Sequence, residues 1–500
     1  MDAAAFLPAP ASSHRRYVGW ALCAALAALA TAMAAVLGSA SNKVLVAGVA
    51  AVAVLPFLLW LRGAQRIASI LVFGIALTVP VNLDFNLFVR KHVGGAPSIT
   101  VSLTVIGFVL FYLVWMHRTA IGLQARTLVF HRPIATAALL LLAATPLSLV
   151  NAADPTLVAL EWIRLVFLVL SMLAVMSLQD ERLVRLWIVA LSVQVVIQSV
   201  LAAAQYALQR PLGLGIFGED ALVAQNIGYV VTRATGTIGH PNILSYFFEI
   251  LLPVMWGLAL TRQRPLYRWW YALACAAGLV GMMTTLSRGA WVTLPVSFTI
   301  VFFMVYGRRI LRVKAAVGAF LLGCCLLVAL YFAYPTIEKR FTHTDYKSSS
   351  SRAPLNRAAW SIVEQFPVTG VGLNNFAESF KVYDTTGHSR IFRGYQHVVH
   401  NLYLWIWVET GTIGLVAYLA PFLVTILVAW RCAPRAPPVP RAILAGAGAG
   451  LLAHLMHGMV DPGFRVSLSV SFLIFTTMGV VGALALRYPA RRPRGPAVPG

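Results

Sequence analysis

The sequence has few charged residues and few cysteines. Charged residues make up 11% of the 500 residues, about half of the ~25% that is usual in soluble domains. This deficit excludes an assembly of soluble domains. The five cysteines, none in a C-x-x-C pair, lie in or beside apolar stretches, so neither a zinc site nor a disulfide framework is indicated.

Apolar residues dominate what remains, at 59% of the chain, with a mean hydropathy of +0.79. They gather in blocks of about the ~20 residues that a helix needs to cross a bilayer. The sequence therefore predicts an all-α polytopic integral membrane protein with about 14 transmembrane helices (12–14). The blocks cover residues 17–38, 44–61, 67–83, 99–117, 133–150, 160–178, 184–208, 240–260, 267–285, 290–306, 311–334, 400–430, 442–459 and 467–487.

The distribution of basic residues predicts the orientation. With alternating spans and both termini in the cytoplasm, more than half of the 39 Lys and Arg residues fall in cytoplasmic segments, as the positive-inside rule requires. The net charge of +23 is then a topology signal that faces anionic lipid headgroups. We expect a multi-pass membrane protein whose basic segments face the cytoplasm, and no nucleic acid is needed to explain the charge.

The predicted organisation has five parts. Residues 1–208 form N-terminal transmembrane helices, and residues 209–334 form a central transmembrane region with an outer loop. Residues 335–399 form a large outer loop before the twelfth span, residues 400–487 the C-terminal helices, and residues 488–500 a cytoplasmic tail. Within the large loop, residues 352–366 read as an amphipathic helix on the membrane surface, ended by Pro367.

Four polar clusters fall at the same outer membrane face in this topology. Burying an ionisable group at a lipid boundary costs free energy, so such residues are candidates for a functional role. The same residue types also fit simpler roles: arginines can reach lipid headgroups, a histidine can cap a helix, and a His-x-x-His pair can hold a metal on one helical face. The clusters are Arg233 with His240 and Asn242, then Ser287 with Arg288 and Gly289, then His397 with His400 and Asn401, and finally His454 with His457 and Asp461.

Two glutamates each follow a histidine by nine residues, Glu249 after His240 and Glu409 after His400. Nine helical residues correspond to ~13.5 Å and a rotation of ~180°. Each glutamate should therefore lie away from its own histidine, either as a buried tie between helices or in its protonated form. Glu161 and Arg164 have the spacing of a structural ion pair.

The ordered set of motifs resembles the O-antigen ligase and Wzy-type polymerase superfamily of bacterial envelope glycosyltransferases. The matching segments are RATGTIGHPN at 233–242, SRG at 287–289, GVGLNNF at 370–376 and HNLYLWIWVETGTIG at 400–414. The resemblance covers residues 230–465. It implies a multi-pass protein of a bacterial inner membrane, with residues 335–399 as a large periplasmic loop. It also implies transfer of a glycan at the periplasmic face, from an undecaprenyl-diphosphate carrier to a hydroxyl acceptor. No metal is expected, and no cofactor is needed because the bond energy resides in the lipid diphosphate.

Within this interpretation, Arg233 and Arg288 stabilise the diphosphate, since guanidinium binds phosphate oxygens bidentately. His400 is the candidate base for the acceptor hydroxyl. The other predicted substrate contacts are Asn401, His240, Asn242, Arg352, Arg357, Arg393, His457 and Asp461. Polymerisation of repeat units of a surface or secreted polysaccharide, with other polysaccharide assembly proteins as candidate partners, is the leading hypothesis. A ligase that joins glycan to lipid A–core is the close alternative, and a small-solute or ion transporter is the alternative of another class.

Overall fold

The computed structural model describes residues 64–92, 94–120, 128–178, 180–226, 230–307, 352–387 and 398–490. The predicted blocks 17–38, 44–61 and 311–334 lie outside these residues, as do Arg393 and His397. The described chain is mostly helical, at 74%, with thirteen α-helices.

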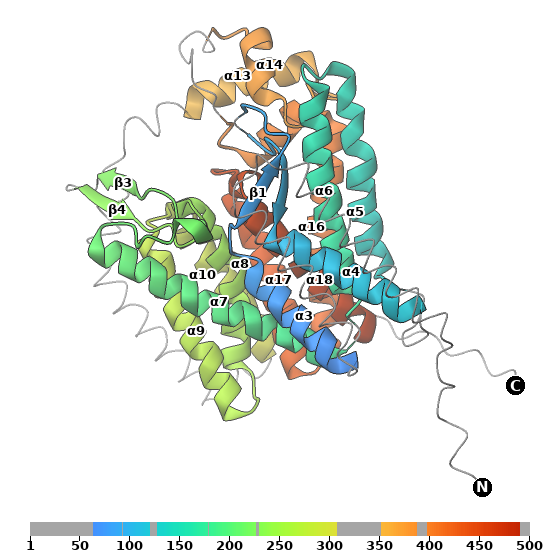
Figure 1. Ribbon diagram of the computed structural model, residues 1–500, viewed down its shortest axis with the longest axis vertical. Helices are drawn as coiled ribbons and strands as arrows, with labels where there is room; N and C mark the ends of the chain where they lie inside the picture. The colour runs from blue at the N-terminus through green and yellow to red at the C-terminus, as the bar shows by residue number, and fades with distance from the viewer. Residues whose placement is uncertain are drawn as a thin grey trace, which may run out of the picture.

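The elements follow the chain in the order shown in Figure 1. They are α3 (Ala64–Thr78), β1 (Asp84–Leu87), β2 (Ile99–Ser102), α4 (Leu103–Ala120), α5 (Arg132–Ala144), η2 (Thr145–Asn151), α6 (Pro155–Met176), α7 (Glu181–Leu208), η3 (Gly215–Phe217), β3 (Val223–Asn226), β4 (Val230–Arg233), α8 (Pro241–Leu260), α9 (Pro265–Thr284), α10 (Arg288–Tyr306), α13 (Arg352–Gln365), α14 (Phe376–Tyr383), α16 (Leu402–Cys432), η5 (Ala433–Arg435), α17 (Pro438–His457), η6 (Gly463–Val466) and α18 (Leu468–Arg487).

Eight helical segments of the described chain are long and apolar enough to cross a membrane: α5 with η2, α6, α7, α8, α10, α16 with η5, α17 and α18. Shorter apolar stretches lie in α3 and α4. The prediction of a helical protein with several spans is confirmed, while the number fourteen stays a prediction.

The expectation of a purely helical chain is wrong in detail, because the structure contains two antiparallel hairpins. β1 pairs with β2, and β3 with β4. The apolar block 99–117, predicted as one helix, begins with strand β2 and becomes helical only at Leu103. Its first residues are Ile99, Thr100 and Val101, and β-branched side chains favour strands.

Local sequence signals explain where the helices begin. Proline occupies the first turn of α5, α6, α8, α9 and α17, where its missing N–H costs no hydrogen bond. The Asp154 carboxylate caps α6 by accepting from the Thr156 amide at 2.8 Å. The Asn401 side chain caps α16 by accepting from the Leu404 amide at 3.0 Å.

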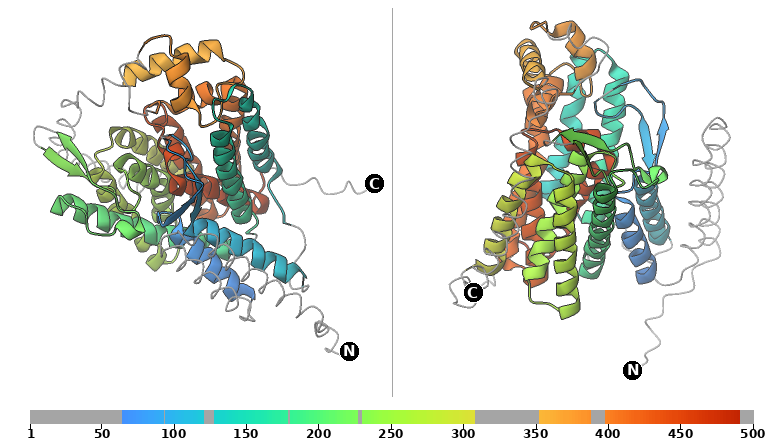
Figure 2. Two further views of the ribbon diagram at one scale, coloured as in Figure 1. Left: turned by 45° about the horizontal axis from the view of Figure 1, so that its top comes forward. Right: turned by 90° about the vertical axis from the view of Figure 1, so that its left-hand side faces the viewer.

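α8 lies in the interior of the bundle, where most of its residues are buried, and packs against α9, α10 and α17. The green and yellow-green helices of this part of the chain lie together in both views of Figure 2. Its contact with α17 is close because two glycines of α17, four residues apart, face it. A Cβ on Gly446 would lie 2.5 Å from the Val254 Cα, and one on Gly450 2.5 Å from the Ile250 carbonyl oxygen. Small residues at this spacing allow two membrane helices to approach at backbone distance.

The predicted amphipathic helix of the large loop is present as α13, which ends at Gln365, two residues before Pro367. Its apolar side does not face outward as an amphipathic surface helix would. Leu355, Ile362 and Val363 are buried in a cluster with Phe376 of α14 and Trp405 of α16. α13 and α14 lie together at one end of the structure, at the top of Figure 1.

Candidate functional site

A cavity of about 760 Å³ opens where several helix ends meet. α8, α10, α13 and α16 all begin beside it, and α17 ends there. Helix N-termini carry partial positive charge and attract anions. The described lining residues are Val223, Ala224, Arg233, His240, Asn242, Ser287, Arg288, Gly289, Val292, Thr293, Arg352, His400, Met456, His457, Met459, Val460 and Asp461.

Most of the site residues that the sequence suggested line this one cavity. Arg233, Arg288 and His400, the proposed catalytic group, all belong to its wall, as do His240, Asn242, Arg352, His457 and Asp461. Asn401 caps α16 and Arg357 is exposed on α13, and neither belongs to the lining. Arg393 lies outside the described residues.

Arg233 is held by a chain of hydrogen bonds that crosses the cavity wall. Its Nε donates to the Thr285 carbonyl oxygen at 2.7 Å, and its Nη2 donates to the Asn242 Oδ1 at 2.5 Å. The Asn242 Nδ2 in turn donates to the Asp461 Oδ2 at 2.7 Å. Residues from β4, α8 and the segment after α17 are thereby fixed relative to one another.

The turn between α9 and α10 brings Arg288 close to Arg233. The Ala234 amide donates to the Thr284 carbonyl oxygen at 3.2 Å, so the end of β4 is tied to the end of α9. Leu286 adopts a left-handed conformation with φ 51° and buries its side chain against Val231. This tight turn leaves the half-buried Arg288 at the first position of α10, in the cavity wall.

His400 lies beside the end of α17 because the two helix ends are joined. The Leu402 amide, at the start of α16, donates to the Gly458 carbonyl oxygen at 2.8 Å. The Tyr403 hydroxyl donates to the Leu455 carbonyl oxygen at 2.5 Å. Since Gly458 directly follows α17, this junction places His400 at the end of α17, and it lines the same cavity as His457 and Asp461.

Arg352 brings the large loop to the cavity. It is the first residue of α13, and its Nη1 donates to the Val460 carbonyl oxygen at 3.3 Å. Of the described residues in the lining, three are therefore arginines, and one, Asp461, carries a carboxylate. The site has an excess of positive charge.

His240 caps α8, with its Nδ1 accepting from the Asn242 amide at 3.2 Å. Because Nδ1 accepts this hydrogen bond, the proton of a neutral His240 imidazole lies on Nε2.

The loop before His240 is held by two glutamines that sequence reasoning missed. The Gln205 Oε1 accepts from the amides of Thr235 and Gly236 at 3.0 and 2.8 Å. The Gln198 Oε1 accepts from the Thr237 amide at 3.0 Å. Their spacing of seven residues on α7 puts both on one helical face, which is the signal that could have found them.

Glu249 lies behind the cavity wall and joins three helices, as predicted for a buried tie. Its Oε2 is 3.0 Å from the His457 Nδ1 of α17, and its Oε1 accepts from the Thr293 hydroxyl of α10. The partner is thus not His240, in agreement with the predicted rotation. The imidazole of His457 also stacks on the Tyr246 ring, with centroids 4.3 Å apart.

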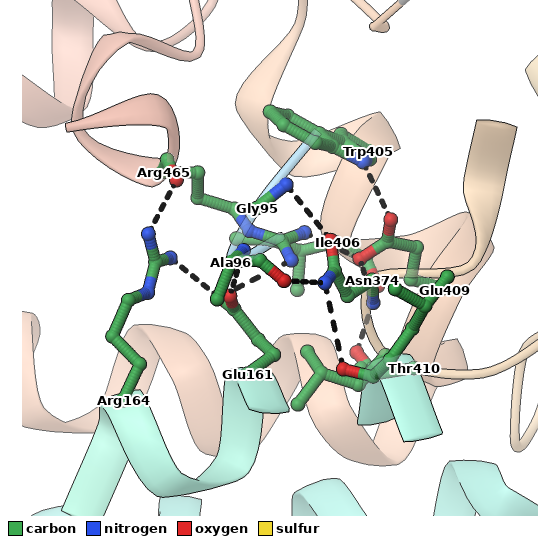
Figure 3. Close-up of polar contacts among 12 residues, drawn as sticks. Gly95, Ala96, Glu161, Arg164, Asn374, Trp405, Ile406, Glu409, Thr410 and Arg465 are labelled. Carbon is green, nitrogen blue, oxygen red and sulfur yellow. Dashed lines mark hydrogen bonds and ion pairs between the residues drawn. The ribbon is translucent and has the colours of Figure 1, made fainter. Parts of the chain in front are cut away.

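A second polar cluster is buried away from the cavity (Figure 3). The predicted pair is present, with the Arg164 Nη2 2.5 Å from the Glu161 Oε1. Arg465, which sequence reasoning missed, completes it: its Nη1 is 2.6 Å from the Glu409 Oε2 and its Nη2 is 3.5 Å from the Glu161 Oε1. The guanidinium of Arg465 also lies 4.4 Å from the Trp405 ring centroid.

This cluster fixes the large loop to the helices. The Glu409 carboxylate accepts from the amides of Asn374 and Phe376 at 2.8 and 3.2 Å. The Asn374 side chain in turn accepts from the Gly95 amide at 2.8 Å. Two carboxylates and two guanidiniums balance each other here, so the cluster has no excess charge for a ligand. Across the described residues, no group of three or more His, Cys, Asp or Glu side chains is arranged to hold a metal ion.

Comparisons with known proteins give one family match. Residues 248–419 match the O-antigen ligase family model, a segment that includes Arg288 and His400 but not Arg233 or Asp461. A chain from a solved structure described as "Structural coordination of polymerization and crosslinking by a peptidoglycan synthase complex" is similar at 18% identity and a TM-score of 0.38, over 73% of this chain and 100% of that chain. No curated protein matches. The match to the O-antigen ligase model confirms, for the segment from α8 to α16, the resemblance to the O-antigen ligase and Wzy-type polymerase superfamily.

Proposed function

We propose that the chain transfers a glycan from an undecaprenyl-diphosphate carrier to a hydroxyl acceptor, at the periplasmic face of a bacterial inner membrane. The observation that carries this proposal is the charge of the cavity. Arg233, Arg288 and Arg352 meet there at the starts of several helices, in a chain that carries an O-antigen ligase segment.

A diphosphate leaving group suits this arrangement. As the bond between the anomeric carbon and the diphosphate oxygen breaks, the electron pair stays on that oxygen. Preorganised cations in a site of low dielectric constant stabilise this developing charge, and guanidinium remains protonated throughout. Arg233 is already held in place by Thr285 and Asn242, so little reorganisation is needed when the donor binds.

The acceptor hydroxyl attacks the anomeric carbon from the side opposite the diphosphate, and the configuration there inverts. Its proton must pass to a base as the new C–O bond forms. His400 is the candidate base, because it lies in the cavity wall at the start of α16. An imidazole titrates near neutral pH and therefore suits this task.

The positions of other basic residues support a periplasmic site. α8 begins at the cavity and ends just before Arg262 and Arg264, and α16 begins there and ends beside Arg431 and Arg435. These basic residues therefore lie at the other ends of the helices. By the positive-inside rule, that end faces the cytoplasm.

Among acceptors, we favour a further repeat unit, so that the product is a polymer on the carrier lipid. The ligase alternative joins the glycan to lipid A–core instead. Analysis of the products separates these two reactions, since one yields a ladder of chains on the carrier and the other a glycan on core.

The test is transfer in vitro by the purified protein with a lipid-linked repeat unit. We expect Arg288→Ala to lower the transfer rate about 10²-fold or more and to weaken donor binding. His400→Ala should lower the rate by about 10²- to 10⁴-fold while donor binding persists.

Arg262→Ala is the matched control, because this exposed arginine lies at the other end of α8. An active wild type whose Arg288→Ala and His400→Ala variants keep near-full rates would contradict the site assignment. Transfer that is absent in the wild type would contradict the function itself.

A further inference from the structure

Helix α13 carries a row of three side chains that leads away from the cavity. Arg352, Asn356 and Trp360 are each four residues apart, so they follow one side of the helix. This α13 row begins in the cavity wall, to which Arg352 belongs, and extends over ~12 Å of helix. Asn356 is half-buried, and Trp360 is 47% exposed. A guanidinium, an amide and an indole thus lie in line, two of them beyond the cavity lining.

Two buried polar atoms of the α13 row have no hydrogen-bond partner among the described residues. They are the Arg352 Nε and the Asn356 Oδ1, which belong to side chains one helical turn apart. Buried polar atoms in folded proteins are nearly always paired. The two atoms therefore indicate a hydrogen-bonding partner that the described chain does not itself provide.

These two atoms require opposite properties of that partner. The Arg352 Nε–H is a donor and needs an acceptor, whereas the Asn356 Oδ1 is an acceptor and needs a donor. An ionised phosphate and a lipid acyl chain donate no hydrogen bond, so neither satisfies the amide oxygen. A hydroxyl group both donates and accepts, and every sugar carries several. The pair of atoms therefore favours a carbohydrate over an anion or a lipid tail.

Trp360 ends the row with an aromatic surface. Its ring forms an edge-to-face pair with Trp407 of α16, with centroids 5.4 Å apart and an angle of 88°. The Trp407 Nε1 donates to the Thr412 hydroxyl at 3.1 Å, which fixes this second ring. The C–H groups on one face of a sugar ring are slightly positive and pack against the negative face of an indole. The exposed ring of Trp360 is thus a second feature that suits a carbohydrate.

The cavity end of the α13 row lies on the same side of the site as His400. Both α13 and α16 begin at the short segment that follows α17, to which the Arg352 side chain and the Leu402 amide donate hydrogen bonds. The two helices pack against each other, and the pair of tryptophans joins them further along. The α13 row therefore runs beside the first turns of α16, away from the proposed base.

We propose that Arg352, Asn356 and Trp360 form a subsite for the acceptor glycan, which holds the sugar residues next to the one whose hydroxyl reacts. Hydroxyl groups of one sugar bond to the Arg352 Nε and the Asn356 Oδ1, and a neighbouring sugar packs on the Trp360 ring. His400 remains the base, and the donor diphosphate remains at Arg233 and Arg288. The inference rests on the proposed function and gives α13 a role in binding the acceptor.

The probe is the oligosaccharide that mild acid frees from the lipid-linked repeat unit, because it lacks both the diphosphate and the lipid. Its Kd for the purified protein is measured by titration calorimetry. Its KM as an acceptor is measured in the transfer assay with a lipid-linked donor. Core oligosaccharide is measured in parallel, because it is the acceptor in the ligase alternative.

Trp360→Leu is the first variant, because it keeps an apolar side chain for any lipid contact but removes the flat ring. We expect the Kd and the acceptor KM to rise about tenfold, with little change in kcat or in the donor KM. Trp360→Phe keeps an aromatic ring and should recover part of the loss. Trp269→Leu is the matched control, because this indole is 70% exposed but lies near the start of α9, at the end of α8 far from the cavity.

Asn356→Leu tests the polar part of the row and separates binding from folding. The amide oxygen has no hydrogen bond to lose among the described residues, so the unfolding temperature in detergent should not fall. The Kd and the acceptor KM should rise about 3- to 10-fold. An amide with a purely structural role would give the reverse result, namely a lower unfolding temperature and an unchanged acceptor KM.

The outcomes separate this inference from the proposed function. Absence of transfer by the wild type contradicts the function, and the calorimetric titration then still tests the subsite. Wild-type binding that persists unchanged in Trp360→Leu and Asn356→Leu refutes the subsite and leaves the α13 row as a hydrated or lipid-facing surface. Failure of both oligosaccharides to bind the wild type refutes it too.

Discussion

Replacement of Arg465 by methionine should strongly destabilise the fold. Arg465 is 2% exposed, and its guanidinium contacts Glu409, Glu161 and the Trp405 ring. Burial acts to lower the pKa of its guanidinium, but the adjacent carboxylates outweigh burial and hold the pKa above its usual value. The group is therefore a cation in the folded protein. Its removal takes away the ion-pair partner of Glu409, while Glu161 keeps its pair with Arg164.

The magnitude follows from what is lost. One charge-assisted hydrogen bond of 2.6 Å contributes about 1.5–3 kcal/mol, and a desolvated cation–π contact adds up to about 2 kcal/mol. Breaking a buried pair by removal of one partner usually costs about 3–5 kcal/mol in total. We expect Arg465→Met to lower the free energy of unfolding by an amount in this range.

The assay is unfolding of the purified protein in detergent, followed by the loss of the monodisperse fraction. Lys381→Met is the matched control. Its ion pair with Glu378 is also close, at 3.2 Å, but the lysine side chain is 56% exposed. Exposed ion pairs contribute at most about 1 kcal/mol to the free energy of unfolding. The double variant Arg465→Met, Glu409→Gln should be less destabilised than the sum of its single variants. Equal stability of Arg465→Met and Lys381→Met would refute the reasoning.

Two further predictions concern stability. Gly411→Ala should displace the large loop, because a Cβ at φ 63° would lie 2.0 Å from the Val368 carbonyl oxygen. Gly213→Ala is the control for the backbone strain alone, because Gly213 has φ 85° and a Cβ there would meet nothing within 4 Å. Equal effects of the two variants on limited proteolysis of the loop would contradict the prediction. Burial raises the pKa of Asp84 to about 6, so the folded state retains a proton that the unfolded chain releases, and the free energy of unfolding should fall as pH rises from about 4 to 6. Asp84→Asn should remove this pH dependence and raise the free energy of unfolding at pH 7 by roughly 1–3 kcal/mol. An unchanged pH dependence in a series of melting curves would argue against this prediction.

Hydropathy alone was enough to locate most of the helices. The apolar blocks that became α7, α8, α10 and α18 agree with the observed bounds to within about three residues, because a run of ~20 apolar residues has few alternatives in a bilayer. The block that begins at Ile99 was wrong at its start. A hydropathy window averages over strand and helix alike, so the β1–β2 hairpin left no separate signal.

The sequence allowed prediction of those cavity residues whose charged or titratable side chains fall at a membrane boundary in the predicted topology. Arg233, Arg288 and His400 stood out because charged or titratable groups at a lipid boundary need a reason. Arg465 did not stand out, since it lies in a short connection after Asp461 and its partner Glu409 is 56 residues away. The packing of α6, α16 and η6 brings Glu161 and Glu409 together, and Arg465 is the second cation that neutralises them. This packing is not visible in the sequence.

Charge balance distinguishes the two polar clusters and suggests how they depend on each other. The buried cluster pairs two carboxylates with two guanidiniums, and its Glu409 holds the backbone of Asn374 in the large loop. The cavity lining has three arginines and one carboxylate among the described residues. Uncompensated positive charge is costly unless an anion binds. We therefore expect the ligand in the cavity and not in the buried cluster. Because α13 packs on α16 and carries Arg352 at its start, the balanced cluster fixes the loop that supplies the third arginine of the unbalanced one. A variant that weakens the Glu409–Arg465 pair should therefore also weaken donor binding, although neither residue reaches the cavity.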